Sequence, residues 1–131
     1  MRWKRITVGD LERILVANDD RFAAILPPGD YWFRMPGKIE IERHDVRDLV
    51  FRSLWEAFLV DQRPDMVNRH FVRVETSETQ IGMVYLNGSL YQVLTPAKRV
   101  LYWRDAGAVS AEIVDVISTP AKVFALSASA C

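Results

Sequence analysis

The sequence predicts a mainly β protein with a minor helical connector, made of two copies of a small antiparallel four-stranded unit. Three observations carry this prediction: a residue pattern that occurs twice, short strand-like runs bounded by turn residues, and one central stretch with helical spacing. An internal repeat is sought first because it defines an architecture before any single element does. We expect the two copies to pack either as two small barrels or as one shared sandwich.

The repeat is clearest between residues 14–33 and 82–101, which match without a gap. Leu94 lies 94 − 26 = 68 positions after Leu26, and each opens a Leu-x-Pro step. After a slip of two residues the match resumes with the pairs Glu42 and Glu112, Asp45 and Asp115, and Val46 and Val116. The expected organisation is a first β unit over 1–50, a helical connector over 51–70, a second β unit over 71–119 and a partly disordered tail over 120–131.

Strands are predicted wherever β-branched and aromatic residues form short runs between turn residues. Asn87-Gly88 is typical of a two-residue hairpin turn. Asn18–Asp20 holds the same place in the first copy, because Asn and Asp tolerate positive φ. The predicted strands are Lys4–Val8, Glu12–Ala17, Arg21–Leu26, Tyr31–Phe33 and Lys38–Val46, followed by Phe71–Glu75, Ser89–Leu94, Val100–Trp103 and Val109–Ile117.

Between the copies the apolar period changes from that of a strand to that of a helix. Arg52–Asp61 carries its apolar residues at helical spacing, and Ser53 is available as a cap at its start. A second short helix is predicted over Pro64–Arg69, since the missing N–H of proline costs nothing in a first turn.

The bulk composition excludes several classes of function. Seventeen basic residues balance seventeen acidic ones, so no net field attracts nucleic acid or an anionic membrane. Cys131 is the single cysteine, which excludes an intramolecular disulfide and a site built from several thiolates. No apolar run approaches the ~18–20 residues of a membrane-spanning helix. A protein with 50% hydrophobic residues over 131 positions can nevertheless build an ordinary core.

Residues 8–33 with their repeat at residues 82–101, and residues 100–118, resemble the N-terminal region of bacterial slipins. Slipins are stomatin-like proteins of the SPFH (Band 7) superfamily. The family pattern is a strand, a Gly-(Asp/Glu) turn, an apolar strand, a short turn carrying Gly, and a Leu-x-Pro-Gly step. This chain shows it as Val8, Gly9-Asp10, Ile14–Val16, Asp19-Asp20 and Leu26–Gly29. Two positions depart from the pattern, with Asp20 and Ala97 standing where glycine is usual.

The resemblance implies a non-enzymatic scaffold and oligomerisation module associated with membrane-linked assemblies. It implies a homo-oligomer, a membrane-anchored NfeD-type protein as a candidate partner, and a cytoplasmic location with at most peripheral contact to the inner membrane. It carries over no catalytic residue, cofactor or metal ligand, and we expect no nucleic-acid partner. Assembly would use exposed strand edges and apolar residues near the repeat turns.

The competing hypothesis is a β-barrel that binds a small ligand or a metal through His44 and His70, the only histidines. Asp45 and Glu42 are candidate partners of His44, and Asp65 and Arg69 of His70, because a His/carboxylate pair can act as a general base and several such groups can hold a metal. Adjacent strand residues point to opposite faces, however, so His44 and Asp45 are not expected to meet. Both histidines are expected at the surface or at an interface, without chemistry.

Two further groups of residues could form sites, and for each we expect a structural role instead. The repeated carboxylates at 42, 45, 112 and 115 are expected to form salt bridges with Arg43, Arg47 or Arg104, or strand-end hydrogen bonds. The aromatic residues are expected in the core, with a ligand pocket inside a small barrel as the alternative. This aromatic group comprises Trp32, Trp55, Phe58, Tyr102 and Trp103.

Overall fold

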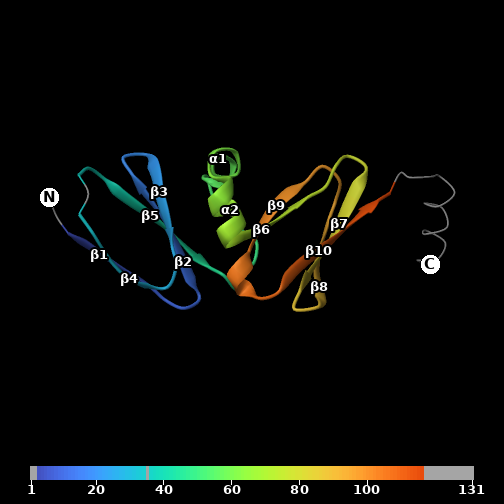
Figure 1. The fold of residues 1–131 in the computed structure, drawn as a ribbon, viewed down its shortest axis with the longest axis horizontal. Helices are drawn as coiled ribbons and strands as arrows, with labels where there is room; N and C mark the ends of the chain where they lie inside the picture. Colours follow the sequence, from blue (N-terminus) through green and yellow to red (C-terminus); the bar gives the residue numbers. More distant parts are fainter. Residues whose placement is uncertain (1–2, 35, 117–131) are drawn as a thin grey trace.

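The computed structural model describes residues 3–34 and 36–116, so the predicted tail and the end of the last predicted strand lie outside the described residues. Figure 1 shows an elongated molecule in which two β units lie side by side along the long axis, with the helical connector between them. The fold class read from the sequence is confirmed, because the chain is mainly β with a short helical segment between two antiparallel units.

The first unit consists of two small sheets. In the described residues, β1 (Lys4–Val8) pairs with β4 (Gly29–Phe33), and the second sheet has the order β3-β2-β5. The strands of that sheet are β2 (Glu12–Asn18), β3 (Arg21–Leu26) and β5 (Ile39–Asp45). All pairings are antiparallel. The first unit thus contains all five strands predicted along the first copy, which is one strand more than the predicted four-stranded unit.

The second unit repeats this arrangement within residues 71–115. Here β6 (Phe71–Glu75) pairs with β9 (Arg99–Trp103), and the second sheet has the order β10-β7-β8. Its strands are β7 (Gln80–Leu86), β8 (Ser89–Leu94) and β10 (Val109–Asp115). In the described part of the chain no sheet closes on itself, so the barrel alternative is wrong. With only two or three strands each, these sheets are too narrow to close into a barrel.

Equivalent hydrogen bonds show that the two units share one backbone plan. Asp19 N donates to Lys38 O at 2.9 Å, and Asn87 N donates to Ala108 O at 2.8 Å. The β2–β3 hairpin and the equivalent β7–β8 hairpin also have a register shift at the same point, between Val16 and Ala17 in the first and between Val84 and Tyr85 in the second. The repeat inferred from a weak sequence match is therefore a repeat of structure. The match without a gap does not extend through β4 and β9, however, because the strand registers set Trp32 against Leu101, one residue later than the sequence match.

The hairpin turns explain the pattern of turn residues. Asp19 and Asp20 have φ values of 49° and 63°, and Asn87 and Gly88 have 52° and 86°. Positive φ at both central residues is the requirement of a type I′ turn, which suits the twist of a hairpin. Ala97 also has a positive φ, of 59°. Asp20 and Ala97, the two positions where glycine is missing from the expected pattern, are thus both left-handed.

The connector becomes helical later than the sequence predicts. The first helix, α1, spans Glu56–Gln62, whereas the expected start was Arg52. Before the helix, residues 49–51 lie against β9, where Phe51 N donates to Leu101 O and Trp103 N donates to Leu49 O, and the chain then turns, with Glu56 N donating to Ser53 O. Ser53 binds the N–H of Trp55 in a turn and does not cap the helix.

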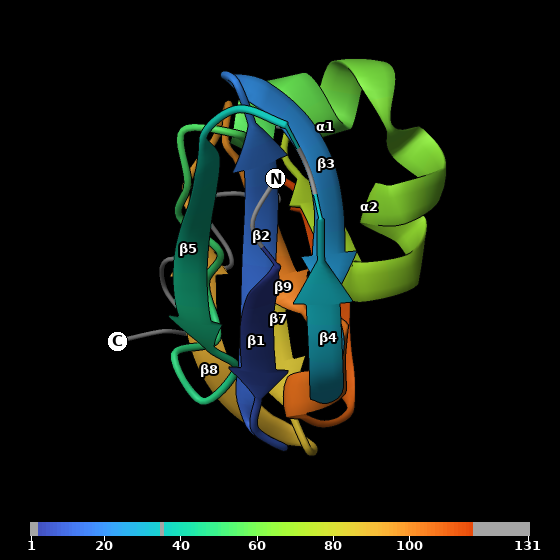
Figure 2. The ribbon, with the colours of Figure 1, turned by 90° about the vertical axis from the view of Figure 1, so that its left-hand side faces the viewer.

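The second helix, α2, spans Pro64–His70 with Pro64 in its first turn, as predicted apart from one additional residue at its end. Figure 2, viewed from the N-terminal end, shows β1 and β4 in front and α1 and α2 together along one side of the sheets. In the described ranges, no helix has the length and hydropathy that a bilayer crossing requires.

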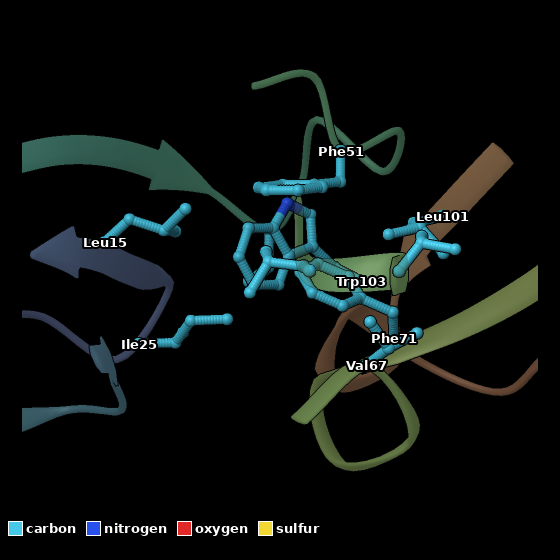
Figure 3. Close-up of a cluster of buried hydrophobic side chains, with 10 residues drawn as sticks. Leu15, Ile25, Phe51, Val67, Phe71, Leu101 and Trp103 are labelled. Carbon is cyan, nitrogen blue, oxygen red and sulfur yellow. The ribbon is translucent and has the colours of Figure 1, made fainter. Parts of the chain in front are cut away.

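Buried side chains gather inside each unit and again at the junction between the units. The first unit encloses Ile6, Val8, Ile14, Val16 and Leu26. The second encloses Leu49, Val74, Val84, Leu94 and Tyr102. The junction core consists of Leu15, Ile25, Val46, Phe51, Leu59, Val60, Val67, Phe71, Leu101 and Trp103, most of which are labelled in Figure 3. The two units are therefore joined by a shared apolar core.

Candidate functional site

Each three-stranded sheet has an inner face, which packs on the two-stranded sheet of its own unit, and an outer face. Side chains alternate along a strand, so Ile14 and Val16 on the inner face place Leu15 on the outer face. In the second unit Val84 is on the inner face, which places Met83 and Tyr85 on the outer one. The outer faces differ in what covers them, and this difference defines the candidate site.

The outer face of the first unit is covered by the rest of the chain. Leu15 is only 1% exposed and lies in the junction core with Ile25, Phe71 and Trp103. Figure 3 shows Leu15 and Ile25 reaching from the first unit toward the indole of Trp103. The second unit and the connector thus use this face as their docking surface.

The connector covers one corner of this face with aromatic rings. The Phe22 ring centroid lies 5.7 Å from that of Trp55 and 6.1 Å from that of Phe58. The guanidinium carbon of Arg63 lies 5.8 Å from the Phe22 ring. Trp55 is half-buried here, while Phe58 retains part of its surface in solvent.

A buried arginine ties the two units together at the same face. Arg13 Nη2 lies 2.9 Å from Asp105 Oδ2, and the arginine side chain is almost fully buried while Asp105 is half exposed. Arg13 Nη1 donates to the carbonyl oxygens of Asp10 and Glu12. Because a buried charge is costly without partners, this set of bonds fixes how the second unit sits on the first.

The structure places His44 inside this junction. Its Nε2 contacts Glu42 Oε1, and its ring centroid lies 5.1 Å from Phe51 and 5.5 Å from Trp103. Asp45 points away and forms its salt bridge with Arg47, as alternation along the strand predicts. The arginine holds the pKa of Asp45 at about 2, below its usual value. His44 is therefore a packed interface residue.

His70 ends α2 near the same junction. Burial lowers its pKa, with Asp105 acting in the opposite direction and Arg69 and Arg13 acting in the same one. Within residues 3–34 and 36–116, no group of three or more His, Cys, Asp and Glu side chains could hold a metal ion. The hypothesis of a site at His44 and His70 gains no support from these residues.

Of the repeated carboxylates, Asp45 forms an expected salt bridge, with Arg47, whereas Glu42 contacts His44 instead of an arginine. Arg43 pairs with Glu12, and Arg104 donates to the carbonyl of Phe71. Glu112 forms no ion pair with any residue of the described ranges. It lies beside Met83 in the pairing of β10 with β7.

The outer face of the second unit is open to solvent. Leu90 is 56% exposed and Val93 is 50% exposed, and Met83 and Tyr85 beside them are partly exposed. The hydroxyl of Tyr85 lies 3.9 Å from the sulfur of Met83, which shows that they share one face. We call this surface the open sheet face, and it comprises Ile81, Met83, Tyr85, Leu90, Val93, Glu112 and Val114.

The opposite end of the molecule carries a second exposed apolar surface, on the outer side of β1 and β4. Trp3 is 61% exposed and Trp32 is 60% exposed. The guanidinium carbon of Arg5 lies 5.7 Å from the Trp32 ring, and that of Arg34 lies 5.8 Å from the Trp3 ring. We call these four residues the Trp–Arg face. The prediction that Trp32 belongs to the core is wrong, whereas Tyr102 and Trp103 are buried as expected.

Among the residues that the structure describes, a shallow polar depression is a further candidate for a small-ligand site. Its one buried hydroxyl, on Thr76, already donates to Thr95 O at 2.8 Å and accepts from Lys98 N at 3.0 Å. The depression is lined by Glu75, Thr76, Ser77, Gln80, Ala97, Lys98 and Arg99. It lacks the apolar lining typical of a small-molecule pocket.

The sequence analysis identified neither the open sheet face nor the Trp–Arg face, although the sequence contains a signal for the open sheet face. Aligning the copies sets Ile81 against Arg13 and Val114 against His44, so outward positions that are polar in the first copy are apolar in the second. Comparison of the chain with protein-family models, with curated proteins and with solved structures found no match. The candidate site therefore rests on the geometry of this chain.

Proposed function

We propose that this chain is a non-enzymatic scaffold module of slipin type that forms homo-oligomers. The observation that supports this most directly is the open sheet face, where Leu90 and Val93 remain half exposed, whereas Leu15 and Ile25 on the counterpart sheet are buried. Contiguous exposed apolar surface on a small protein marks an interaction site more often than it is accidental. The Trp–Arg face adds a second such surface, at the other end of the molecule.

The free energy expected from burying these exposed side chains fits reversible assembly. Burying the two tryptophans with Leu90 and Val93 would yield on the order of 10 kcal/mol at ~25 cal/mol per Å². Association itself costs roughly 4–15 kcal/mol in lost freedom of motion. Because these amounts are similar, we expect assembly to depend on protein concentration, and to be strengthened where many copies are held together.

The slipin-like context adds the expected surroundings of the assembly. The proposal includes a cytoplasmic location, peripheral contact with the inner membrane at most, and a membrane-anchored NfeD-type partner. These features come from the sequence resemblance, and the balanced charge of the chain agrees with contact through apolar surface. Attraction to an anionic membrane surface would instead depend mainly on an excess of Lys and Arg residues.

The experiment that tests this function is the molar mass of the protein in solution. Size exclusion with light scattering over a hundredfold range of concentration should give multiples of the chain mass of 15.1 kDa that increase with concentration. A particle that keeps the mass of one chain throughout would contradict the scaffold function. Native mass spectrometry on the same samples would then look for a co-purified small molecule.

A further inference from the structure

We propose that copies of this chain associate head to tail, with the Trp–Arg face of one copy seated on the open sheet face of the next. The contact between copies would reproduce the contact that already joins the two units within one chain. This inference rests on the proposed function and deepens it, because it names both surfaces and their relative orientation.

The Trp–Arg face is the counterpart of the surface by which the second unit docks. In the two-stranded sheet of the first unit, Arg5 is paired with Trp32 and Ile6 with Tyr31. The equivalent pairs in the second unit are Arg73 with Leu101 and Val74 with Val100. One step further along, Trp3 and Arg34 take the places of Phe71 and Trp103. The docking residues Phe71, Leu101 and Trp103 thus correspond to Trp3, Trp32 and Arg34.

The open sheet face is the counterpart of the surface that receives this docking. Positions match through the shared hairpin, so Met83 corresponds to Leu15, Leu90 to Phe22 and Val93 to Ile25. In the first unit these positions are buried or half-buried under the second unit and the connector. In the second unit they carry apolar side chains of similar size, and no described residue covers them to the same extent.

Charge favours the same pairing. Trp103 packs against His44, whose partner is Glu42. In the proposed contact between copies, Arg34 takes the place of Trp103, Val114 that of His44, and Glu112 that of Glu42. Arg34 would therefore approach Glu112, a carboxylate that forms no ion pair with a residue in the described ranges. The buried Arg13 of the first unit is replaced by Ile81, so the new contact would bury no isolated charge.

The position of the two faces determines the kind of assembly. They lie at opposite ends of the long axis, as Figures 1 and 2 show for β1 and β4 at one end and for the sheet of β7, β8 and β10 at the other. Two different surfaces that pair in this way form a heterologous contact, which continues into a filament or closes into a ring. Stacking of this kind is the behaviour of repeat proteins whose terminal units are not capped by polar residues.

The decisive experiment uses one blocked end per variant. Trp32→Glu blocks the Trp–Arg face, and Val93→Glu blocks the open sheet face; both positions are exposed, so both variants should fold. Each change should weaken self-association at least about 100-fold, as for a central contact residue. Each variant alone should be a monomer, and an equimolar mixture should form a heterodimer that grows no further. Asn68→Glu, on the exposed side of α2, should assemble like the wild type.

The outcomes separate this inference from the scaffold function. A wild type that stays monomeric contradicts both. A wild type that assembles while Trp32→Glu alone still forms dimers indicates that two open sheet faces pair with each other, and it overturns the head-to-tail arrangement only. A mixture that remains monomeric also overturns it. As a second readout, Arg34→Glu should weaken assembly and Glu112→Arg should restore it in the double variant, whereas no rescue would contradict the predicted ion pair.

Discussion

The outer faces of the two three-stranded sheets have the same backbone and register but different surroundings. In the first unit the face is buried and includes polar groups with specific partners, namely Arg13 with Asp105 and His44 with Glu42. In the second unit the face is exposed and the corresponding residues, Ile81 and Val114, are apolar. A permanent contact within one chain can hold buried polar groups in place, because their partners are always present. A reversible contact gains more from apolar surface that needs no exact partner.

The largest expected difference between the faces concerns the packing of equivalent aliphatic residues. Ile25→Ala should lower the free energy of unfolding by about 2–5 kcal/mol, because it leaves a cavity in the junction core. Val93→Ala, at the matching position, should lower it by less than about 1 kcal/mol, because half of that side chain is already in solvent. Urea unfolding at concentrations where the chain is monomeric measures both values. Equal losses would mean that the two faces are equally buried.

An intermediate effect is expected at the ion pair that distinguishes the covered face. Asp105→Ala would leave the buried guanidinium of Arg13 without its carboxylate, at a cost of about 1–3 kcal/mol. The cost should stay below that of breaking a fully buried pair, since Asp105 is half exposed. The control is Glu75→Ala, which removes the exposed pair with Arg73 and should cost less than about 1 kcal/mol. Similar losses for both variants in urea unfolding would show that Arg13 does not depend on Asp105.

The smallest expected effect makes the two hairpin turns alike. Asp20 has a positive φ where the second unit has Gly88, so Asp20→Gly should raise the free energy of unfolding by up to about 1 kcal/mol. Gly88→Ala should lower it by a similar amount, because alanine disfavours the left-handed region. Thermal unfolding of both variants provides the measurement. A loss of stability in Asp20→Gly would indicate that the aspartate side chain matters more than its backbone angle.

Much of the fold could be predicted because its signals are local. The alternation of Ile39 and Ile41 with glutamates, the Asn87-Gly88 turn and the Leu-x-Pro steps each act within a few residues, and each corresponds to an observed strand or turn. The start of α1 could not be predicted in this way. The approach to α1 is fixed by the contact of residues 49–51 with β9, which is some fifty positions later in the sequence, and by a turn closed by Ser53 and Glu56; helical spacing contains no information about that contact.

The candidate site was less visible than the fold because exposure is not a local property. The sequence marked Trp32 and Trp103 as similar core aromatics, yet one is 60% exposed and the other is buried. Both lie on the outer side of a two-stranded sheet. Only Trp103 has a neighbouring unit to pack against, and the choice between core and surface therefore depends on what lies beside the sheet.

Local signals in the sequence are enough to predict that this protein has two similar β units, where their turns lie, and that a short helical segment separates them. These features follow from side-chain periodicity and from backbone preferences, which act over short distances. Three-dimensional packing, in contrast, is needed to see that one outer sheet face is covered while its counterpart is open, and that the Trp–Arg face lies at the far end. The physical reason is that burial depends on which segments pack together, and one unit has a following unit to cover it whereas the other does not.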